Sequence, residues 1–180
     1  MLIILKSNDG GAIHVDHSVM AHSMHVTEQI RDHGYNVKKD EKMELNLDIK
    51  YKILVKIVEW CTQYKDHAVP PKAELRKRHK KWTVPEWDKK FLEIDTPSLF
   101  ELTNACYMLK IHYLIENTCK TIADNIKGKS PGEIRAYLNL PGSSDDLPGP
   151  STQGPRMHPM SNAAVSAVAN AIAKAAQGLG

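Results

Sequence analysis

The sequence predicts an α/β unit at the N-terminus, an all-helical unit after it, and a disordered C-terminal tail. In residues 1–65, short apolar stretches that suit strands alternate with signals for helix starts. In residues 85–140, apolar residues recur at steps of three and four, which places them on helical stripes. Residues 141–180 begin with a stretch rich in proline, glycine and serine, a composition typical of chain that does not fold by itself.

The N-terminal unit opens with a predicted β-hairpin. Leu2–Leu5 has the composition of a buried strand, residues 8–11 (Asn-Asp-Gly-Gly) are a turn signal, and Ala12–Val15 predicts the second strand. A third strand is expected at Met43–Leu47, where apolar and polar residues alternate.

Two short helices are expected within this unit. Asp16 can cap a helix that runs through Ala21, because a carboxylate at this position accepts a hydrogen bond from a free backbone N–H. Ser23 can cap the next helix in the same way, and Gly34 can end it.

A long helix from Asp48 to about Lys65 completes the unit. Its apolar residues cover a face of roughly 100° or more, the width expected of a helix packed on a core. They are Ile49, Ile53, Leu54, Ile57, Val58, Trp60, Cys61 and Tyr64.

Residues 66–84 form a predicted linker with a high positive charge. Pro70-Pro71 favours an extended chain. The basic residues that follow are Lys72, Arg76, Lys77, Arg78, Lys80 and Lys81. Charge runs of this kind usually do no more than keep a linker solvated and extended. The same residues could also serve nuclear import or contact an acidic partner.

The unit at residues 85–140 contains three predicted helices. The first starts at Thr96, which is followed by proline, and the second ends at residues 127–128 (Lys-Gly). The third starts at Ser130 in a capping box and runs through Leu138. The stripe of the first helix is Leu99, Leu102, Cys106 and Leu109, and that of the second is Ile111, Ile115, Cys119, Ile122 and Ile126.

This helical unit is too small, at about 55 residues, to bury a good core alone. Its apolar stripes therefore need cover from the first unit, from a partner, or from both. An amphipathic helix of another protein, laid against such a face, is a common mode of recognition.

The tail contains one further helix signal. Ser161–Gln177 is rich in alanine, the residue with the highest helix propensity, and has Val165, Val168 and Ile172 at helical steps. The pattern predicts about four helical turns. Its small side chains would bury little area, so we expect weak docking or folding only on binding.

The composition is that of a soluble protein. Of the 180 residues, 42% are hydrophobic and 25% charged, and the net charge of +3 is too small to imply nucleic acid binding by itself. Leu2–Leu5 is too short for the core of a signal peptide. No run reaches the roughly 18 apolar residues of a membrane span.

The sequence holds no recognisable catalytic or metal-binding set. It has no glycine-rich phosphate loop, no nucleophile elbow and no paired carboxylates in a cavity-like setting, so we expect no enzyme. The tight histidine pairs, His14/His17 and His22/His25, lack a cysteine partner, so we expect no metal and no cofactor. We expect reduced core thiols at the three cysteines. They are Cys61, Cys106 and Cys119.

Three stretches carry a resemblance to a known family: WDKKFLEID, LFEL and CKTIADNIKGKSPGEIR. They resemble the S-phase kinase-associated protein 1 family, the small adaptors of SCF-type ubiquitin ligases, and the resemblance runs from about Leu2 to Leu140. It implies a BTB/POZ fold for residues 1–65 and an F-box-binding (dimerisation) unit at 85–140. It also implies a protein of cytoplasm and nucleus that bridges a cullin and F-box substrate receptors, with no small-molecule substrate and no membrane contact.

The resemblance also implies two sets of binding residues. Tyr107-Met108 stands where the family usually has an Asn-Tyr pair at the cullin side, so we expect an altered cullin contact. The residues expected on the F-box side are Phe100, Ile115, Cys119, Ile122, Ile126 and Ile134. Each of these can equally be a plain core residue, since apolar helical stripes are usually core first.

Two other functions stay open. The family ends in further helices that grip the F-box, whereas this chain continues into its proline- and glycine-rich tail. A chain that has lost full F-box binding could instead be a structural or self-associating protein. Binding of nucleic acid through Lys72–Lys81 is a third hypothesis, and it predicts an affinity that falls steeply with salt.

Overall fold

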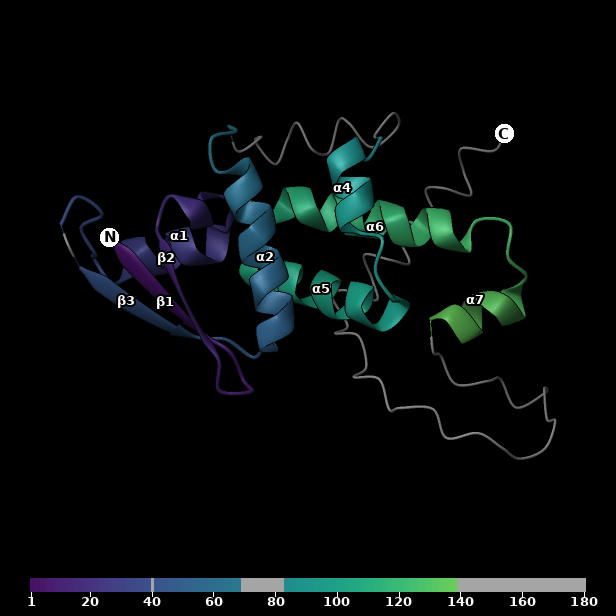
Figure 1. Cartoon of the computed structure of the whole chain (residues 1–180), viewed down its shortest axis with the longest axis horizontal. Coiled ribbons are helices and arrows are strands. Elements are labelled where there is room, and N and C mark those ends of the chain that lie inside the picture. Colours follow the sequence, from purple (N-terminus) through teal and green to yellow (C-terminus); the bar gives the residue numbers. More distant parts are fainter. Residues whose placement is uncertain (40, 69–82, 139–180) are drawn as a thin grey trace.

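The computed structural model describes residues 1–39, 41–68 and 83–138. Its sheet has three strands, β1 (Leu2–Lys6), β2 (Ala12–Asp16) and β3 (Lys42–Asn46), in the order β2-β1-β3 (Figure 1). β1 pairs antiparallel with β2 and parallel with β3. The predicted hairpin and the third strand are therefore confirmed.

One face of the sheet points into the core. Ile3 lies opposite Val15 on one side and Met43 on the other, and all three are buried. Because successive side chains of a strand point to opposite faces, Leu5 also points into the core, while Leu2, Ile4 and Lys6 point to the other face.

The helices after the hairpin are the 3-10 helix η1 (Val19–His22) and α1 (Met24–Asp32). The Ser23 hydroxyl accepts from the Val26 amide at 3.2 Å, so the predicted cap of α1 is confirmed. The prediction for Asp16 is wrong: the N-cap of η1 is Ser18, and the Asp16 carboxylate accepts from its amide instead.

The long helix α2 (Tyr51–Tyr64) starts later than predicted. Asp48 does not cap it and instead accepts a hydrogen bond from the Asn8 side chain at 2.8 Å. The carboxylate that meets the first turn belongs to Asp9, whose two oxygens accept from the Tyr51 amide at 3.0 and 3.1 Å. The hairpin turn therefore supplies the cap of a helix that is 42 positions away in sequence.

The second unit consists of α4 (Glu86–Phe91), α5 (Thr96–Leu109), α6 (His112–Ile126) and α7 (Pro131–Tyr137). The sequence patterns did not predict α4. The α5 cap is Asp95 and not Thr96, because the Asp95 carboxylate accepts from the Ser98 amide at 3.0 Å. The capping box of α7 is confirmed, with both reciprocal hydrogen bonds between Ser130 and Glu133.

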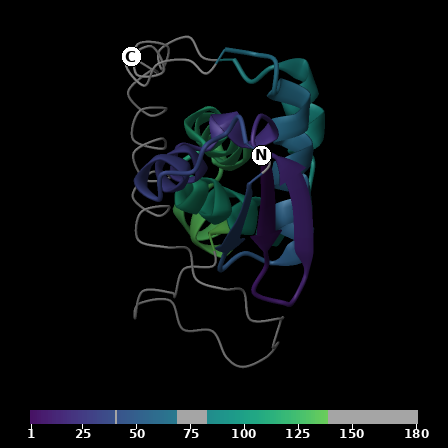
Figure 2. The ribbon, with the colours of Figure 1, turned by 90° about the vertical axis from the view of Figure 1, so that its left-hand side faces the viewer.

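Both predicted stripes of this unit are buried. Buried residues of the sheet, α2, α5 and α6 belong to one continuous hydrophobic core. Figure 1 shows α2 between the sheet and the α5–α6 pair, and Figure 2 views the molecule from the end that carries the sheet. The first unit therefore covers the helical unit, which is one of the two sources of cover that the sequence left open.

The basic linker and the alanine-rich segment fall almost wholly outside the described residues. Within the described part of the chain, no helix is both long enough and apolar enough to cross a membrane.

Candidate protein-binding surface

Asp88 fixes α4 against α2. Its side chain is fully buried, and one carboxyl oxygen accepts from Trp60 Nε1 at 2.6 Å. The other oxygen accepts from the Tyr64 hydroxyl. Burial and the neighbouring Asp88 carboxyl together raise the pKa of Tyr64, so this hydroxyl keeps its proton and remains a donor.

Aromatic rings surround this joint. Trp60 stacks on Tyr64 with ring centroids 4.6 Å apart, and both rings also contact Tyr113 of α6. On α4, Trp87 stacks on Phe91 at 5.1 Å. Together with the Asp88 hydrogen bonds, these contacts join α2, α4 and α6, so the surface of α6 is presented on a rigid support.

The residues predicted for the F-box side fall on three consecutive helices. Phe100 lies on α5 and Ile134 on α7, while α6 carries the others, which are Ile115, Cys119, Ile122 and Ile126. The five residues on α5 and α6 are buried, with Phe100 3% exposed and Ile122 fully enclosed, whereas Ile134 is half-buried. In this conformation, Ile122 is a core residue, and a partner could reach the other buried members only if something that covers them moved.

Part of the cover over Phe100 comes from α7. The Tyr137 ring meets the Phe100 ring edge-on, with centroids 5.7 Å apart and planes at 76°. The Tyr137 hydroxyl accepts a hydrogen bond from Asn125 Nδ2 of α6 at 3.1 Å. Sequence reasoning missed both residues, because α7 is too short for its periodicity to show which side chain turns back onto α5.

The pair predicted for the cullin side is divided between the interior and the surface. Met108 is 43% exposed at the end of α5. Tyr107 is half-buried, and its hydroxyl lies 4.0 Å from Cys119 Sγ, a member of the set predicted for the F-box side. Burial, with Cys119 and its neighbours, raises the pKa of Tyr107. The two predicted sets therefore meet inside the molecule at this contact.

The end of α5 around Met108 is tied to α1. The Ser23 hydroxyl donates to the Leu109 carbonyl oxygen at 2.6 Å, and Lys110 forms an ion pair with Glu28 at 2.5 Å. Lys110 itself has a φ of 53°, so α5 ends in a left-handed residue that is not glycine. The exposed Met108 side chain thus stands on a corner shared by both units.

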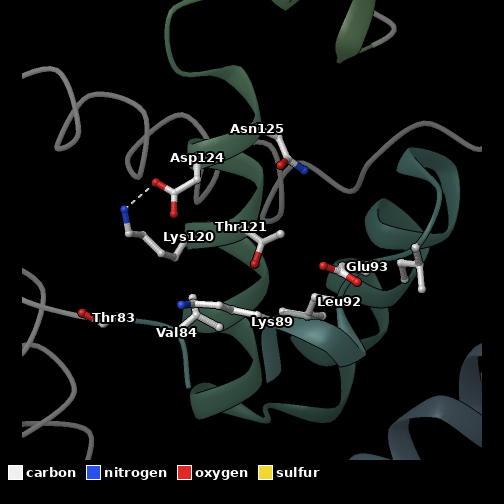
Figure 3. A pocket seen from close by; sticks show the side chains of 10 residues that line it. Thr83, Val84, Lys89, Leu92, Glu93, Lys120, Thr121, Asp124 and Asn125 are labelled. Carbon is white, nitrogen blue, oxygen red and sulfur yellow. Dashed lines mark hydrogen bonds and ion pairs between the residues drawn. The ribbon is translucent and has the colours of Figure 1, made fainter. Parts of the chain in front are cut away.

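A cavity of about 640 Å³ lies between α4 and α6 (Figure 3). Both lysines and acidic residues line the cavity, and Lys120 Nζ forms an ion pair with Asp124 Oδ1 at 2.6 Å. It is lined by Thr83, Val84, Lys89, Leu92, Glu93, Ile94, Lys120, Thr121, Asp124 and Asn125. None of the residues predicted for either binding side lines it.

The described residues offer no arrangement for metal or thiol chemistry. Among them, no group of three His, Cys, Asp or Glu side chains could hold a metal ion. All three cysteines are free and buried. Burial raises the pKa of Cys61 to about 12 and that of Cys119 to about 11, so these thiols stay protonated and unreactive at neutral pH.

Comparisons with known proteins give one consistent result. Residues 1–66 match the model of the Skp1 family, tetramerisation domain, and residues 112–142 match the Skp1 family, dimerisation domain. The chain is 36% identical over 138 residues to the E3 ubiquitin ligase complex SCF subunit sconC of Neosartorya fischeri. The same protein of Aspergillus fumigatus is equally similar. Each alignment covers 77% of this chain and 85% of the relative.

Proposed function

The chain belongs to the Skp1 family, and on that premise we propose that it is a non-catalytic adaptor which bridges a cullin scaffold and F-box substrate receptors. The proposal rests on the similarity to SCF ubiquitin ligase subunits, which extends over both units and not over one motif alone. In this role the chain gives a ligase its choice of substrate by holding two proteins together, and it supplies no chemistry.

Two features of the molecule support a bridging role. The α5–α6–α7 region carries an apolar surface, and Ile134 at its edge is half-buried. A partly exposed apolar side chain at this place suits the docking of an amphipathic helix. Near the C-terminal end of α5, the Met108 side chain is exposed where α5 is tied to α1. An exposed apolar side chain on a rigid support suits a protein contact.

Co-purification tests the proposal directly. The chain is co-expressed with one F-box protein and one cullin N-terminal domain, and the mixture is separated by size. We expect a ternary peak. Binding to the cullin without the F-box protein would favour a structural role, and binding to neither by a folded chain, or self-association alone, would contradict the adaptor function.

A pair of surface substitutions separates the two proposed contacts. Met108→Glu should weaken cullin binding at least tenfold and leave F-box binding unchanged, because it places a charge in an apolar contact. Ile134→Glu should do the reverse. Because neither side chain is buried, both variants should fold, and each serves as the control for the other in a titration against the two partners. Equal loss of both partners in either variant would contradict the assignment. Tyr107 is unsuited to this test, since its hydroxyl lies against Cys119.

A further inference from the structure

The outer face of the sheet carries apolar side chains along its middle strand. Leu2 and Ile4 of β1 point away from the core and are half-buried. Polar and charged side chains frame them, and all of these are exposed. They are His14 and Asp16 on β2, and Lys42, Glu44 and Asn46 on β3. An apolar centre within a polar rim is the pattern of a protein contact, and this one lies at the end of the molecule that Figure 2 shows.

The first row of this face has opposite charges at its two ends. Leu2 lies directly between Asp16 on β2 and Lys42 on β3. A twofold axis parallel to β1 would exchange the two edge strands, so that β2 of one copy lies over β3 of a second copy. Asp16 of each copy then faces Lys42 of the other, and the two Leu2 side chains meet at the axis. Stacked sheets lie about 10 Å apart, a gap that an aspartate and a lysine side chain close by extending toward each other.

The second row follows the same rule. Ile4 lies between His14 and Glu44, so the same axis places each His14 opposite Glu44 of the other copy and brings the two Ile4 side chains together. In the third row the two Lys6 side chains meet, and each already forms an ion pair with Glu44 of its own copy at 2.5 Å. Asp16 lies 3.5 Å from the N-terminal amino group, but its side chain is 53% exposed and can still be reached. The face is therefore complementary to itself in both its apolar and its charged groups.

We propose that two copies of this chain pack these faces together and form a dimer with a twofold axis parallel to β1. Three strands of five residues make a small face, since strands lie about 4.8 Å apart and rise about 3.3 Å per residue. The face is smaller than the ~800 Å² per partner of a standard interface. The dimer is therefore weak, with a dissociation constant on the order of 100 µM.

The dimer leaves the proposed receptor side free. In Figure 1 the sheet and α7, the helix that carries Ile134, lie at opposite ends of the molecule. Two receptors can then enter one assembly, and a substrate with two recognition motifs gains affinity because its second motif binds at a high effective concentration. Only this consequence rests on the proposed function. The dimer itself forms without any receptor.

Analytical ultracentrifugation of the full chain, with no other protein added, tests the dimer. Between about 5 µM and 1 mM we expect the mean mass to rise from that of a monomer toward that of a dimer. Ile4→Glu should raise the dissociation constant at least about tenfold, because it brings two like charges together at the axis. Lys127→Glu, an exposed charge reversal at the end of α6, is the control and should dimerise unchanged. A chain that stays monomeric up to 1 mM, or a dimer that Ile4→Glu leaves intact, would overturn the inference, and any occupant of this face is then a different protein.

An exchange of charges tests the arrangement without depending on Ile4. Lys42→Glu should raise the dissociation constant at least about threefold, because a carboxylate then faces Asp16 of the other copy. Adding Asp16→Lys to the same chain restores opposite charges and should return the dissociation constant to within about twofold of that of the unmodified chain. Within one copy β1 separates the two positions, so only contact between copies explains such a rescue. A double variant as weak as Lys42→Glu alone would show that the axis is wrong.

Discussion

Buried polar side chains decide how the two units join. Asp88 accepts hydrogen bonds from Trp60 and Tyr64, two donors that belong to the other unit. Removing a buried acceptor leaves its donors without partners, which costs more than the hydrogen bonds contribute. One carboxyl group therefore supplies the acceptors for two donors at the joint between α2 and α4.

Asp88→Ala should lower the free energy of unfolding by about 3 kcal/mol, because it leaves the Trp60 indole N–H and the Tyr64 hydroxyl unsatisfied in the interior. Urea denaturation would measure this loss. Asp88→Asn should cost less, since its amide can still accept from Trp60 and donate to Tyr64. Asp124→Ala removes an exposed ion pair with Lys120 and should change the stability by less than about 1 kcal/mol. A loss for Asp88→Ala no larger than that for Asp124→Ala would contradict the role of the joint.

The lowered pKa of Asp16 makes the stability of the protein depend on pH. A hydrogen bond from the Ser18 amide, with the Ser18 side chain and His17, lowers the pKa of this carboxyl to about 2. Because the pKa is lower in the folded protein, the charged carboxyl stabilises the fold at pH values above its ordinary pKa of about 3.8. This gain in stability is lost as the pH falls toward 2. Because the carboxyl is 53% exposed, solvent screening keeps the gain to about 1 kcal/mol or less.

Asp16→Asn should therefore destabilise the protein at pH 6 and have little effect near pH 2, as followed by thermal denaturation across this range. His14→Asn, an exposed substitution two positions earlier on β2, is a control. A loss for Asp16→Asn that stayed constant from pH 6 to pH 2 would show that the charge plays no part.

At the scale of elements, local patterns and the structure diverge at three helix starts, those of η1, α2 and α5. Asp48 shortly precedes α2 in the sequence, where a capping residue is expected. The Tyr51 amide at the start of α2 instead donates its hydrogen bond to the Asp9 carboxylate. The close approach of the hairpin to α2 makes this possible. It also leaves no room beside Gly11, where an added Cβ would lie 2.2 Å from Cδ2 of the Tyr51 ring.

Gly11→Ala should reduce the stability by about 1–3 kcal/mol, since the Tyr51 ring or the hairpin has to shift. Gly132→Ala on α7 is the matched substitution, because an added Cβ there meets nothing within 4 Å. It should be neutral or stabilise the protein by up to about 1 kcal/mol, as alanine is the better helix former. The melting temperatures of the two variants, each compared with the unmodified protein, check both expectations. Similar changes in the two variants would mean that the hairpin does not pack closely against α2.

On the scale of the whole molecule, the described units share one core. Leu102 of α5 is fully enclosed and belongs to the same cluster as Ile3 of β1. Domains with separate cores unfold separately, whereas a shared core makes unfolding cooperative. We therefore expect the sheet and the helices to unfold together.

Leu102→Ala should lower the free energy of unfolding by about 3 kcal/mol through the cavity it leaves. If unfolding is cooperative, the protection of the β1 amides against hydrogen exchange should fall by about 100-fold although β1 is in the other unit. Met108→Ala on the exposed side of the same helix is the control. Unchanged β1 protection in Leu102→Ala would show that the two units unfold independently.

The sequence by itself determined the order of the elements other than α4, and it determined which sides of them are apolar. The alternation of Met43–Leu47 and the stripe from Ile111 to Ile126 both appear in the structure as expected. Local capping signals such as Ser23 and the box at Ser130 were equally readable. Each of these patterns repeats over short steps or involves residues a few positions apart. A single stretch of sequence therefore contains the whole pattern.

Only the tertiary structure decided which residues meet across the fold. The Asp9 cap, the Asp88 joint and the Tyr137–Phe100 contact each join residues at least 24 positions apart. For the candidate surface, the sequence placed an apolar stripe on α6 and Ile134 on the next helix, but only the structure shows that Ile122 is enclosed and Ile134 is half-buried. The physical reason is that an apolar period fixes a helical face, while packing alone selects what covers that face.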